Sequence, residues 1–318
     1  MKLTELMEKI HCSQGSVEDM LALKETLDRA GISLENIYQE LEMSSAYVDS
    51  HRDVSTTSTP IAPHSHSFFE FIYCSSCEDV EYLLGGQRYK LQRGDVILIP
   101  PGISHCPLFP ETMKRAYERI VVWVNESLIN DFANRWPEIE YADRERHRQY
   151  LLRTAGSPWE DHLHEAFARG CRESELRQSG WEAALYGNTT YLLILLNRAL
   201  SQQRQPVHER SGLLDELLGY VEGHYRERIT LTTAARQLLV SESSITHLIR
   251  RRMGISFYQY VTKRRLSAAK KLIDEGEALS GVGERCGFCD HSAFYRAFRR
   301  EYGIAPSEYK SLQNKRRA

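Results

Sequence analysis

The feature that most constrains this fold is a short helix, a tight break and a second helix, a pattern that occurs twice near the carboxyl end. In residues 229–254, apolar spacing predicts the first helix, with the stripe Ala234, Ala235, Leu238 and Leu239. Ser241 follows the break and is a good N-cap for the second helix. Its inward side carries Ile245, Leu248 and Ile249, and its outward side Ser243, Ser244, Thr246, His247 and Arg250. This is a helix-turn-helix arrangement, whose exposed polar face can enter a major groove.

The second copy, in residues 278–303, repeats the arrangement with different side chains. Val282 and Cys286 line its first helix, Gly287 supplies the turn and Asp290 can cap the second helix. The predicted buried side is Ala293, Phe294, Ala297 and Phe298, and the exposed side is His291, Ser292, Tyr295, Arg296 and Arg299. Residues 256–276 predict one amphipathic helix that holds the two units at a fixed separation.

Two such units joined by one helix and closed by 302-YGIAPSEYK-310 resemble the DNA-binding domain of AraC-family transcription regulators. The other matching pieces are residues 254–273 and the Gly287-Phe288 turn, and the resemblance covers residues 215–312. In that family both second helices enter successive major-groove turns on one face of DNA. Where many members have proline after the capping serine, this chain has Glu242.

The resemblance implies a set of DNA-contacting residues in the two second helices. They are Ser243, Thr246, His247, Arg250, His291, Ser292, Tyr295 and Arg296. Arg296 is suited to bidentate pairing with guanine, and the short hydroxyl side chains can approach base edges or phosphates. The cations expected to meet phosphates or water are Arg250, Arg251, Lys263, Arg264 and Arg299.

Charge is distributed unevenly along the chain. Residues 213–318 contain 19 Lys and Arg against 12 Asp and Glu, a net charge of +7, and the remainder carries −9. A basic end on an acidic body favours a polyanionic partner. Charge alone would also be explained by a charged surface that contacts only water.

Residues 64–124 change to short apolar runs separated by turn signals such as Gly85-Gly86 and Pro101-Gly102. The runs cover residues 68–74, 80–86, 88–91, 95–102 and 119–124. Several short strands joined by tight turns predict a β-barrel or sandwich. The alternating side chains Phe69, Phe71 and Tyr73 are expected to fill the core between its sheets.

Two pieces of this β-region carry side chains suited to a binding site. Residues two apart share one side of a strand, so His64, His66 and Glu70 are expected to project together. His105 follows the Pro-x-Gly turn of residues 94–105. The two pieces resemble the cupin motifs His-x-His-x3-Glu and Gly-x5-Pro-x-Gly-x2-His.

In cupin enzymes these four positions hold a divalent metal, usually iron, manganese or zinc. In AraC-family sensors the cupin-like barrel usually binds an effector. Three interpretations of His64, His66, Glu70 and His105 therefore stay open. They are a divalent metal site, metal-free hydrogen bonding to a hydroxyl-rich effector, and a structural role.

These patterns predict a multidomain α+β fold. Its parts are an N-terminal helical extension (1–50), a cupin-like effector-binding barrel (51–125), a helical dimerisation region (126–205), a linker (206–212) and an AraC-type DNA-binding domain (213–318). The apolar helix of residues 181–200 must bury its stripe against a partner subunit or against the barrel of the same chain. Pairing of this helix with a partner subunit, and hence a homodimer, is the expectation.

No secretion signal is visible, and no apolar run is long enough to span a bilayer, so a cytoplasmic protein without a membrane partner is expected. The leading hypothesis is a ligand-responsive regulator, not an enzyme, that binds promoter DNA and needs no cofactor. By analogy with the family, the effector is a sugar, RNA polymerase is a partner and the outcome is activation. The alternatives are a metal-dependent cupin enzyme fused to a DNA-binding domain and a barrel that docks another protein.

Overall fold

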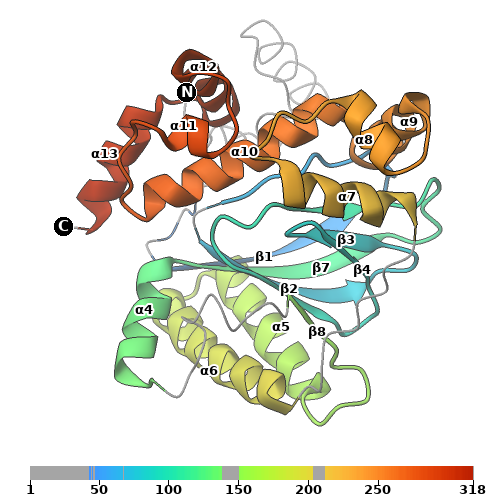
Figure 1. The fold of residues 1–318 in the computed structure, drawn as a ribbon. Helices are drawn as coiled ribbons and strands as arrows, with labels where there is room; N and C mark the ends of the chain where they lie inside the picture. Colours follow the sequence, from blue (N-terminus) through green and yellow to red (C-terminus); the bar gives the residue numbers. More distant parts are fainter. Residues whose placement is uncertain are drawn as a thin grey trace, which may run out of the picture.

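The computed structural model describes residues 43, 45, 47–66, 68–137, 150–202 and 212–317 (Figure 1). The predicted helical extension up to residue 42 and the predicted linker over residues 206–211 lie outside these ranges. Figure 1 shows four layers: helices of residues 126–202, a five-stranded sheet, a three-stranded sheet, and helices of residues 213–317. The expected α+β fold, with a cupin-like β-region and a helical carboxyl domain, is confirmed.

The strands form two antiparallel sheets. They are β1 (Val48–Ser55), β2 (Phe69–Ser76), β3 (Glu81–Leu84), β4 (Gln87–Lys90), β5 (Val96–Ile99), β6 (His105–Leu108), β7 (Tyr117–Val124) and β8 (Leu151–Leu152). One sheet has the order β1-β7-β2-β5-β8, and the other has the order β4-β3-β6. Gly85 and Gly86 join β3 to β4 with φ of 54° and 84°, a conformation that favours glycine in a two-residue hairpin turn.

The side chains of β2 alternate between two different cores. Ile72 belongs to the core between the sheets, together with Ile97 and Leu84. Phe71 belongs instead to the core on the other side of the sheet, which contains Phe167. The expectation that Phe69, Phe71 and Tyr73 fill the space between the sheets is therefore wrong, because helices cover the outer face and bury these rings there.

Two strands fall in segments where helices were expected. β1 includes residues 48–50 of the predicted extension and pairs along its whole length with β7. Its sequence VDSHRDVS has few apolar residues, so the alternation of apolar and polar side chains that predicts a strand is weak. β8 lies within the predicted helical region 126–205 and pairs with β5 over Leu151 and Leu152. A pairing this short leaves no recognisable pattern in the sequence.

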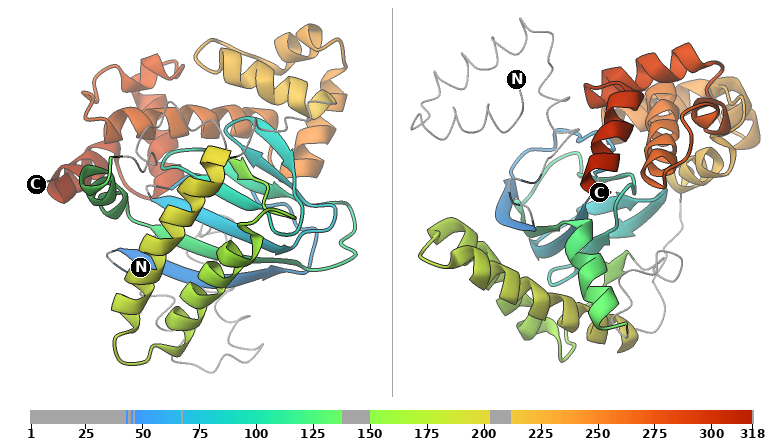
Figure 2. Two further views of the ribbon diagram at one scale, coloured as in Figure 1. Left: turned by 90° about the horizontal axis from the view of Figure 1, so that it is seen from below. Right: turned by 90° about the vertical axis from the view of Figure 1, so that its left-hand side faces the viewer.

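Among the described residues, three helices cover the five-stranded sheet: α4 (Glu126–Arg135), α5 (Glu160–Leu176) and α6 (Trp181–Gln202). Figure 2 shows α5 and α6 lying side by side across the sheet. Leu192, Leu193 and Leu196 of α6 are fully buried in the core that this helix shares with α5 and the sheet. The same chain thus buries the apolar stripe of residues 181–200. None of the helices in the described ranges is long and apolar enough to cross a bilayer.

The carboxyl domain is entirely helical within the described residues. Its helices are α7 (Leu213–His224), α8 (Leu231–Gln237), α9 (Glu242–Met253), α10 (Phe257–Asp274), α11 (Val282–Arg285), α12 (His291–Tyr302) and α13 (Pro306–Arg317). Ser241 Oγ accepts a hydrogen bond from Ser244 N at 3.0 Å, and Asp290 Oδ1 accepts one from Ala293 N at 2.6 Å. Both predicted helix pairs and both predicted caps are confirmed.

One apolar residue of the first pair does not lie where the sequence places it. Leu239, predicted in the buried stripe of α8, is 92% exposed with φ of 57°. It lies in the turn after α8, where the backbone becomes left-handed and turns the side chain to solvent. The stripe of α8 is formed instead by Ala234 and Ala235, with Leu238 partly buried.

The first helix pair shares a core with the three-stranded sheet. Leu83 of β3 and Cys106 and Leu108 of β6 pack in one cluster with the buried face of α7, formed by Leu214, Leu217, Leu218 and Val221. Ser267 of α10 adds a hydrogen bond from its Oγ to the Gly102 carbonyl, at 2.7 Å. The second pair has its own core, which includes Phe294 and Phe298.

Gly287→Ala is predicted to destabilise the carboxyl domain more than Gly281→Ala. Both glycines have positive φ, 86° and 89°, so each substitution incurs strain of about 1–2 kcal/mol. A Cβ at Gly287 would also lie 2.5 Å from the Tyr225 carbonyl oxygen, whereas one at Gly281 meets nothing within 4 Å. Crowding against backbone adds about 1–3 kcal/mol. Urea unfolding measures the difference, and equal losses would contradict this packing.

Candidate binding site and nucleic-acid interface

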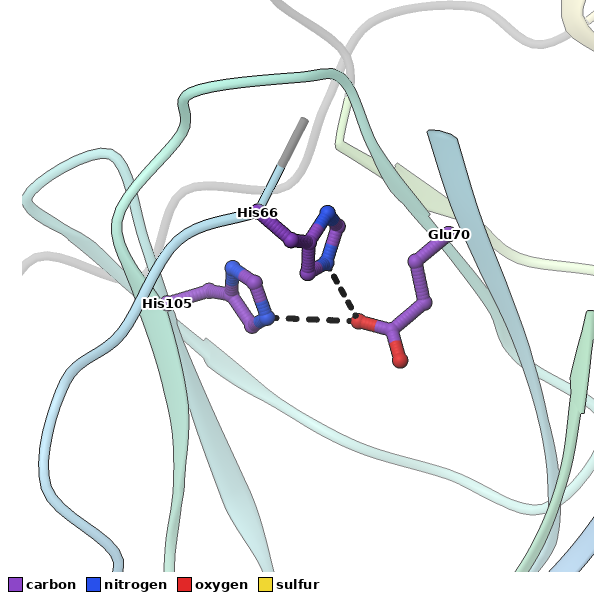
Figure 3. Close-up of side chains that lie close together, drawn as sticks. All are labelled: His66, Glu70 and His105. Atoms are coloured by element: carbon purple, nitrogen blue, oxygen red, sulfur yellow. Dashed lines mark hydrogen bonds and ion pairs between the residues drawn. The ribbon is translucent and has the colours of Figure 1, made fainter. Parts of the chain in front are cut away.

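A buried cluster of two imidazoles and one carboxylate lies between the sheets (Figure 3). Glu70 comes from β2, His105 begins β6, and His66 precedes β2. Glu70 Oε2 lies 3.2 Å from His66 Nε2 and 3.2 Å from His105 Nε2. Trp123 of β7 donates its Nε1–H to Glu70 Oε1 at 2.8 Å. One carboxylate oxygen is therefore held by tryptophan, and the other faces both rings.

The other nitrogen of each ring is held by the backbone. His66 Nδ1 lies 2.8 Å from the Phe68 carbonyl oxygen, and His105 Nδ1 lies 2.8 Å from that of Ile103. Because a carbonyl oxygen only accepts hydrogen bonds, Nδ1 must carry the proton in each ring. In the neutral tautomer, Nε2 then has a lone pair directed toward Glu70. Backbone contacts of this kind fix ring orientation in metal sites.

The charge state of the cluster follows from its burial. Burial lowers the pKa of His66, against the opposing effect of Glu70, so the neutral ring is favoured. Burial by itself raises the pKa of Glu70, but hydrogen bonds from His105 and His66, and the positive charge of these rings when Nε2 is protonated, outweigh it and bring this pKa well below its usual range. Glu70 is therefore a carboxylate, and when Nε2 of both rings carries no proton, three electron-pair donors converge on one point.

The donor atoms of His66, Glu70 and His105 lie within 4.8 Å of one another. Two imidazole nitrogens and one carboxylate are ligands that zinc, iron and manganese accept in proteins. Hydroxyl groups of a ligand can satisfy the same acceptors by donating hydrogen bonds. The residues thus fit a divalent cation, and their hydrogen-bonding capacity also suits the hydroxyl groups of a ligand.

His64 lies beside the cluster rather than within it. Its backbone pairs with that of His105, with N–O distances of 3.0 and 2.9 Å, and the two ring centroids are 4.3 Å apart. His64 Nδ1 donates to the Ala62 carbonyl at 3.2 Å, and its ring supplies none of the three converging atoms. The expected single strand from His64 to Glu70 is wrong, because β2 begins only at Phe69. Burial lowers the pKa of His64 to about 3.

Two aromatic neighbours complete the cluster, and the sequence did not identify their roles. The ring of Phe68 stacks on that of His66, with centroids 4.0 Å apart and an interplanar angle of 1°. Trp123 stands opposite Glu70 in the β2–β7 register. Only knowledge of that register could have paired tryptophan with the glutamate.

The structure also presents the predicted DNA-contacting residues on two helices. Those on α9 are all exposed: Ser243, Thr246, His247 and Arg250. On α12, His291, Ser292 and Arg296 are exposed, and Tyr295 is half-buried. Ser241 caps α9 although Glu242 occupies the position where many AraC-family members have proline. The Glu242 carboxylate accepts a hydrogen bond from Thr232 Oγ1 at 2.7 Å. The polar faces expected to enter DNA therefore point to solvent.

Three of the cations expected to meet phosphates instead have carboxylate partners. Arg251 pairs with Glu111, Lys263 with Glu301, and Arg264 with Glu222. Arg250 and Arg299 are exposed. Of these pairs, only that of Arg251 joins the carboxyl domain to the β-region.

Comparisons with known proteins agree with both halves of this description. Residues 53–115 match a cupin domain, and residues 234–311 match a helix-turn-helix domain. The probable transcriptional regulator LumQ of Photobacterium leiognathi is 34% identical over 123 residues, which are 38% of this chain and 48% of that protein. The arabinose operon regulatory protein of Escherichia coli K12 is 25% identical over 231 residues, 71% of this chain and 75% of that protein. The match thus covers less than half the length of LumQ.

A solved structure, ToxT from Vibrio cholerae, aligns over 84% of this chain and 98% of its own, with 13% identity and a TM-score of 0.33. The fold and the domain matches define a chain in which a cupin-like β-region precedes two helix-turn-helix units. As the sequence motifs indicated, the chain is similar to AraC-family transcription regulators in both of these domains.

Acidification is predicted to destabilise the metal-free protein, kept in a chelator. His64 and His66 have folded pKa values below the usual value of about 6.5, so the unfolded chain binds more protons as the pH falls. Stability is therefore lost below about pH 6.5, by at most about 1.4 kcal/mol per pH unit for each histidine. Urea unfolding at pH 7, 6 and 5 should show a shallower loss in His64→Gln. The exposed His162→Gln is the control, and an unchanged slope in His64→Gln would contradict the assignment.

Proposed function

We propose that this protein is a ligand-responsive regulator that binds promoter DNA through α9 and α12 and senses a small molecule at the His66–Glu70–His105 cluster. The observation that carries this proposal is the position of β6. His105 of β6 belongs to the buried cluster, and its neighbour Cys106 belongs to the core that contains α7. Successive side chains of a strand point to opposite faces, so β6 contacts the site on one side and the DNA-binding domain on the other.

A cavity of about 960 Å³ between the two domains lies beside the segment that leads into this strand. Residues Gly102, Ile103 and Ser104 line it from the β-region, and Ser267 and Lys271 of α10 line it from the carboxyl domain. The Ile103 carbonyl is the group that orients His105. A molecule in this cavity would therefore touch the segment that positions a site residue and, at the same time, the helix between the two DNA-binding units.

The effector we propose is hydroxyl-rich, with a sugar as the first class to test. Three converging acceptors suit hydroxyl donors, and the arabinose operon regulatory protein is among the relatives. A divalent cation held by His66, Glu70 and His105 is the other occupant that fits, and it would supply a Lewis acid for ligand oxygens. The function as a regulator requires neither a resident cofactor nor a catalytic step.

Pairing of two chains is part of the proposal. The buried stripe of α6 packs within its own chain, but Tyr186 and Tyr191 of the same helix are 41% and 45% exposed. Tyr47 packs edge-on against Tyr186, with ring centroids 5.9 Å apart. These tyrosines offer a pairing surface. Activation, contact with RNA polymerase and a cytoplasmic location are proposed from the family alone.

Regulation requires the effector to favour one arrangement of the domains over another. In this proposal, an effector at the cluster changes the position of β6 and hence the packing of Cys106 and Leu108 against α7. The two helix-turn-helix units then change their orientation relative to the β-region. An effector that bound both arrangements equally would regulate nothing.

Arg296→Ala is predicted to reduce sequence-specific DNA binding by about 1–3 kcal/mol, because a bidentate contact to guanine is lost. Arg299→Ala, on the same helix, should weaken specific and nonspecific binding alike, as expected for a phosphate contact. The operator is selected from random duplexes with the wild-type protein, and affinities are measured by fluorescence anisotropy. An unchanged ratio of specific to nonspecific affinity in Arg296→Ala would contradict its role in base reading.

Occupancy of the cluster can be tested by thermal shift and metal analysis. Sugars, or Zn²⁺ and Mn²⁺, should raise the melting temperature of the wild type but not of His66→Gln, because a ligand that prefers the native state stabilises it. The exposed His162→Gln should respond as the wild type does. A rise with metal alone identifies the cation, and turnover of a substrate would favour the enzyme alternative. Equal shifts in wild type and His66→Gln would contradict binding at this cluster.

A further inference from the structure

We propose that the β-region competes with DNA for the arginines at the carboxyl end of α9, and that the arrangement seen in the structure therefore binds DNA weakly. Arg251 pairs with Glu111, and Arg252 pairs with Glu81 of β3. Both carboxylates belong to the β-region, and both arginines belong to a helix whose exposed residues are expected to read DNA. The inference rests on the proposed DNA-binding function.

The Glu81 contact is part of a network that joins the two domains. Glu81 also accepts a hydrogen bond from Arg88 Nη1 at 3.0 Å. Arg88 in turn donates from Nη2 and Nε to the two carboxylate oxygens of Asp215 on α7, at 2.7 and 3.1 Å. The side chains of Glu81 and Arg252 are only 22% and 25% exposed, so water and salt screen their interaction less than that of a surface pair.

Carboxylates and phosphates bind a guanidinium group through the same geometry, with parallel N–H groups donating to two oxygens. Arg252 cannot satisfy Glu81 and a phosphate with the same N–H groups. Arg251 and Arg252 follow Thr246 and His247 by about one to two helical turns on α9, so Glu81 and Glu111 bring two negative charges to the carboxyl end of the helix proposed to read DNA. Release of these arginines should therefore precede or accompany tight binding.

The charge distribution along the sequence agrees with this competition. Residues 213–318 carry +7 and the remainder −9, so the two parts attract each other in the absence of DNA. Glu81 stands opposite Leu108 in the β3–β6 register, and Leu84 stands opposite His105. The carboxylate that holds Arg252 is thus on the strand that pairs with the site strand β6, and an effector at the cluster can loosen this contact.

The test is the DNA affinity of Glu81→Gln/Glu111→Gln. Both substitutions keep side-chain size and remove the charge that competes with phosphate. We expect the variant to bind a nonspecific 30-base-pair duplex about 5- to 20-fold more tightly than the wild type at low salt. Each released arginine that reaches a phosphate adds about 0.9 to the slope of log affinity against log salt, so the slope should steepen by up to about 2.

The matched control is Glu165→Gln/Glu182→Gln, which removes two exposed charges from α5 and α6. Its net charge equals that of the test variant, so it reports the effect of overall charge alone, and its salt slope should equal that of the wild type. The single variant Glu111→Gln serves as a second test, because Glu111 is 67% exposed and its loss leaves the Glu81 network intact. It should show about half of the change in slope.

Three results would overturn the inference. The test variant and the control could show equal affinities and slopes, or the test variant could bind more weakly than the control although urea unfolding shows it folded. Either result would leave the proposed DNA-binding function in place. If neither the wild type nor any variant bound DNA, the proposed function would fall, and the inference with it.

Discussion

The structure depends on one packing constraint, the burial of the outer face of the three-stranded sheet. Leu83, Cys106 and Leu108 would be exposed apolar side chains if α7 did not cover them. Because an apolar face in water costs about 25 cal/mol for each Å², α7 is held against this sheet and the first helix-turn-helix unit follows it. The position of the helices proposed to bind DNA is therefore set by the same strands that hold the proposed binding site.

The outer face of these strands is apolar, whereas their inner face is polar at the proposed binding site. Backbone carbonyls fix the Nδ1 protons of His66 and His105, and Trp123 fixes one oxygen of Glu70. Every remaining atom that faces the centre is an acceptor. Buried acceptors without donors are costly, so the arrangement favours an occupant that brings a positive charge or hydroxyl protons. The proposed sensing site and the helices proposed to read DNA thus lie on opposite faces of a single sheet.

The helix-turn-helix units could be predicted because their signals are local. Caps at Ser241 and Asp290, the Gly287 turn and apolar spacing all act within a few residues, and the structure confirms them. The cupin resemblance also indicated that His66, Glu70 and His105 lie together, although His105 is 35 residues from Glu70 and no local signal joins them. The rest required long-range information. The outward burial of Phe71 depends on α5, and the Trp123–Glu70 contact depends on strand register.

Hydrogen–deuterium exchange on the full chain, with and without operator DNA, tests most directly whether the sheet couples sensing to DNA reading. If it does, DNA binding changes the exchange rates of amides in β3 and β6, because the helices packed on them must move. Amides of β1, at the far edge of the other sheet, should keep their rates. Unchanged rates in β3 and β6 at saturating DNA would show that the domain reads DNA without disturbing the sheet, and would contradict the account.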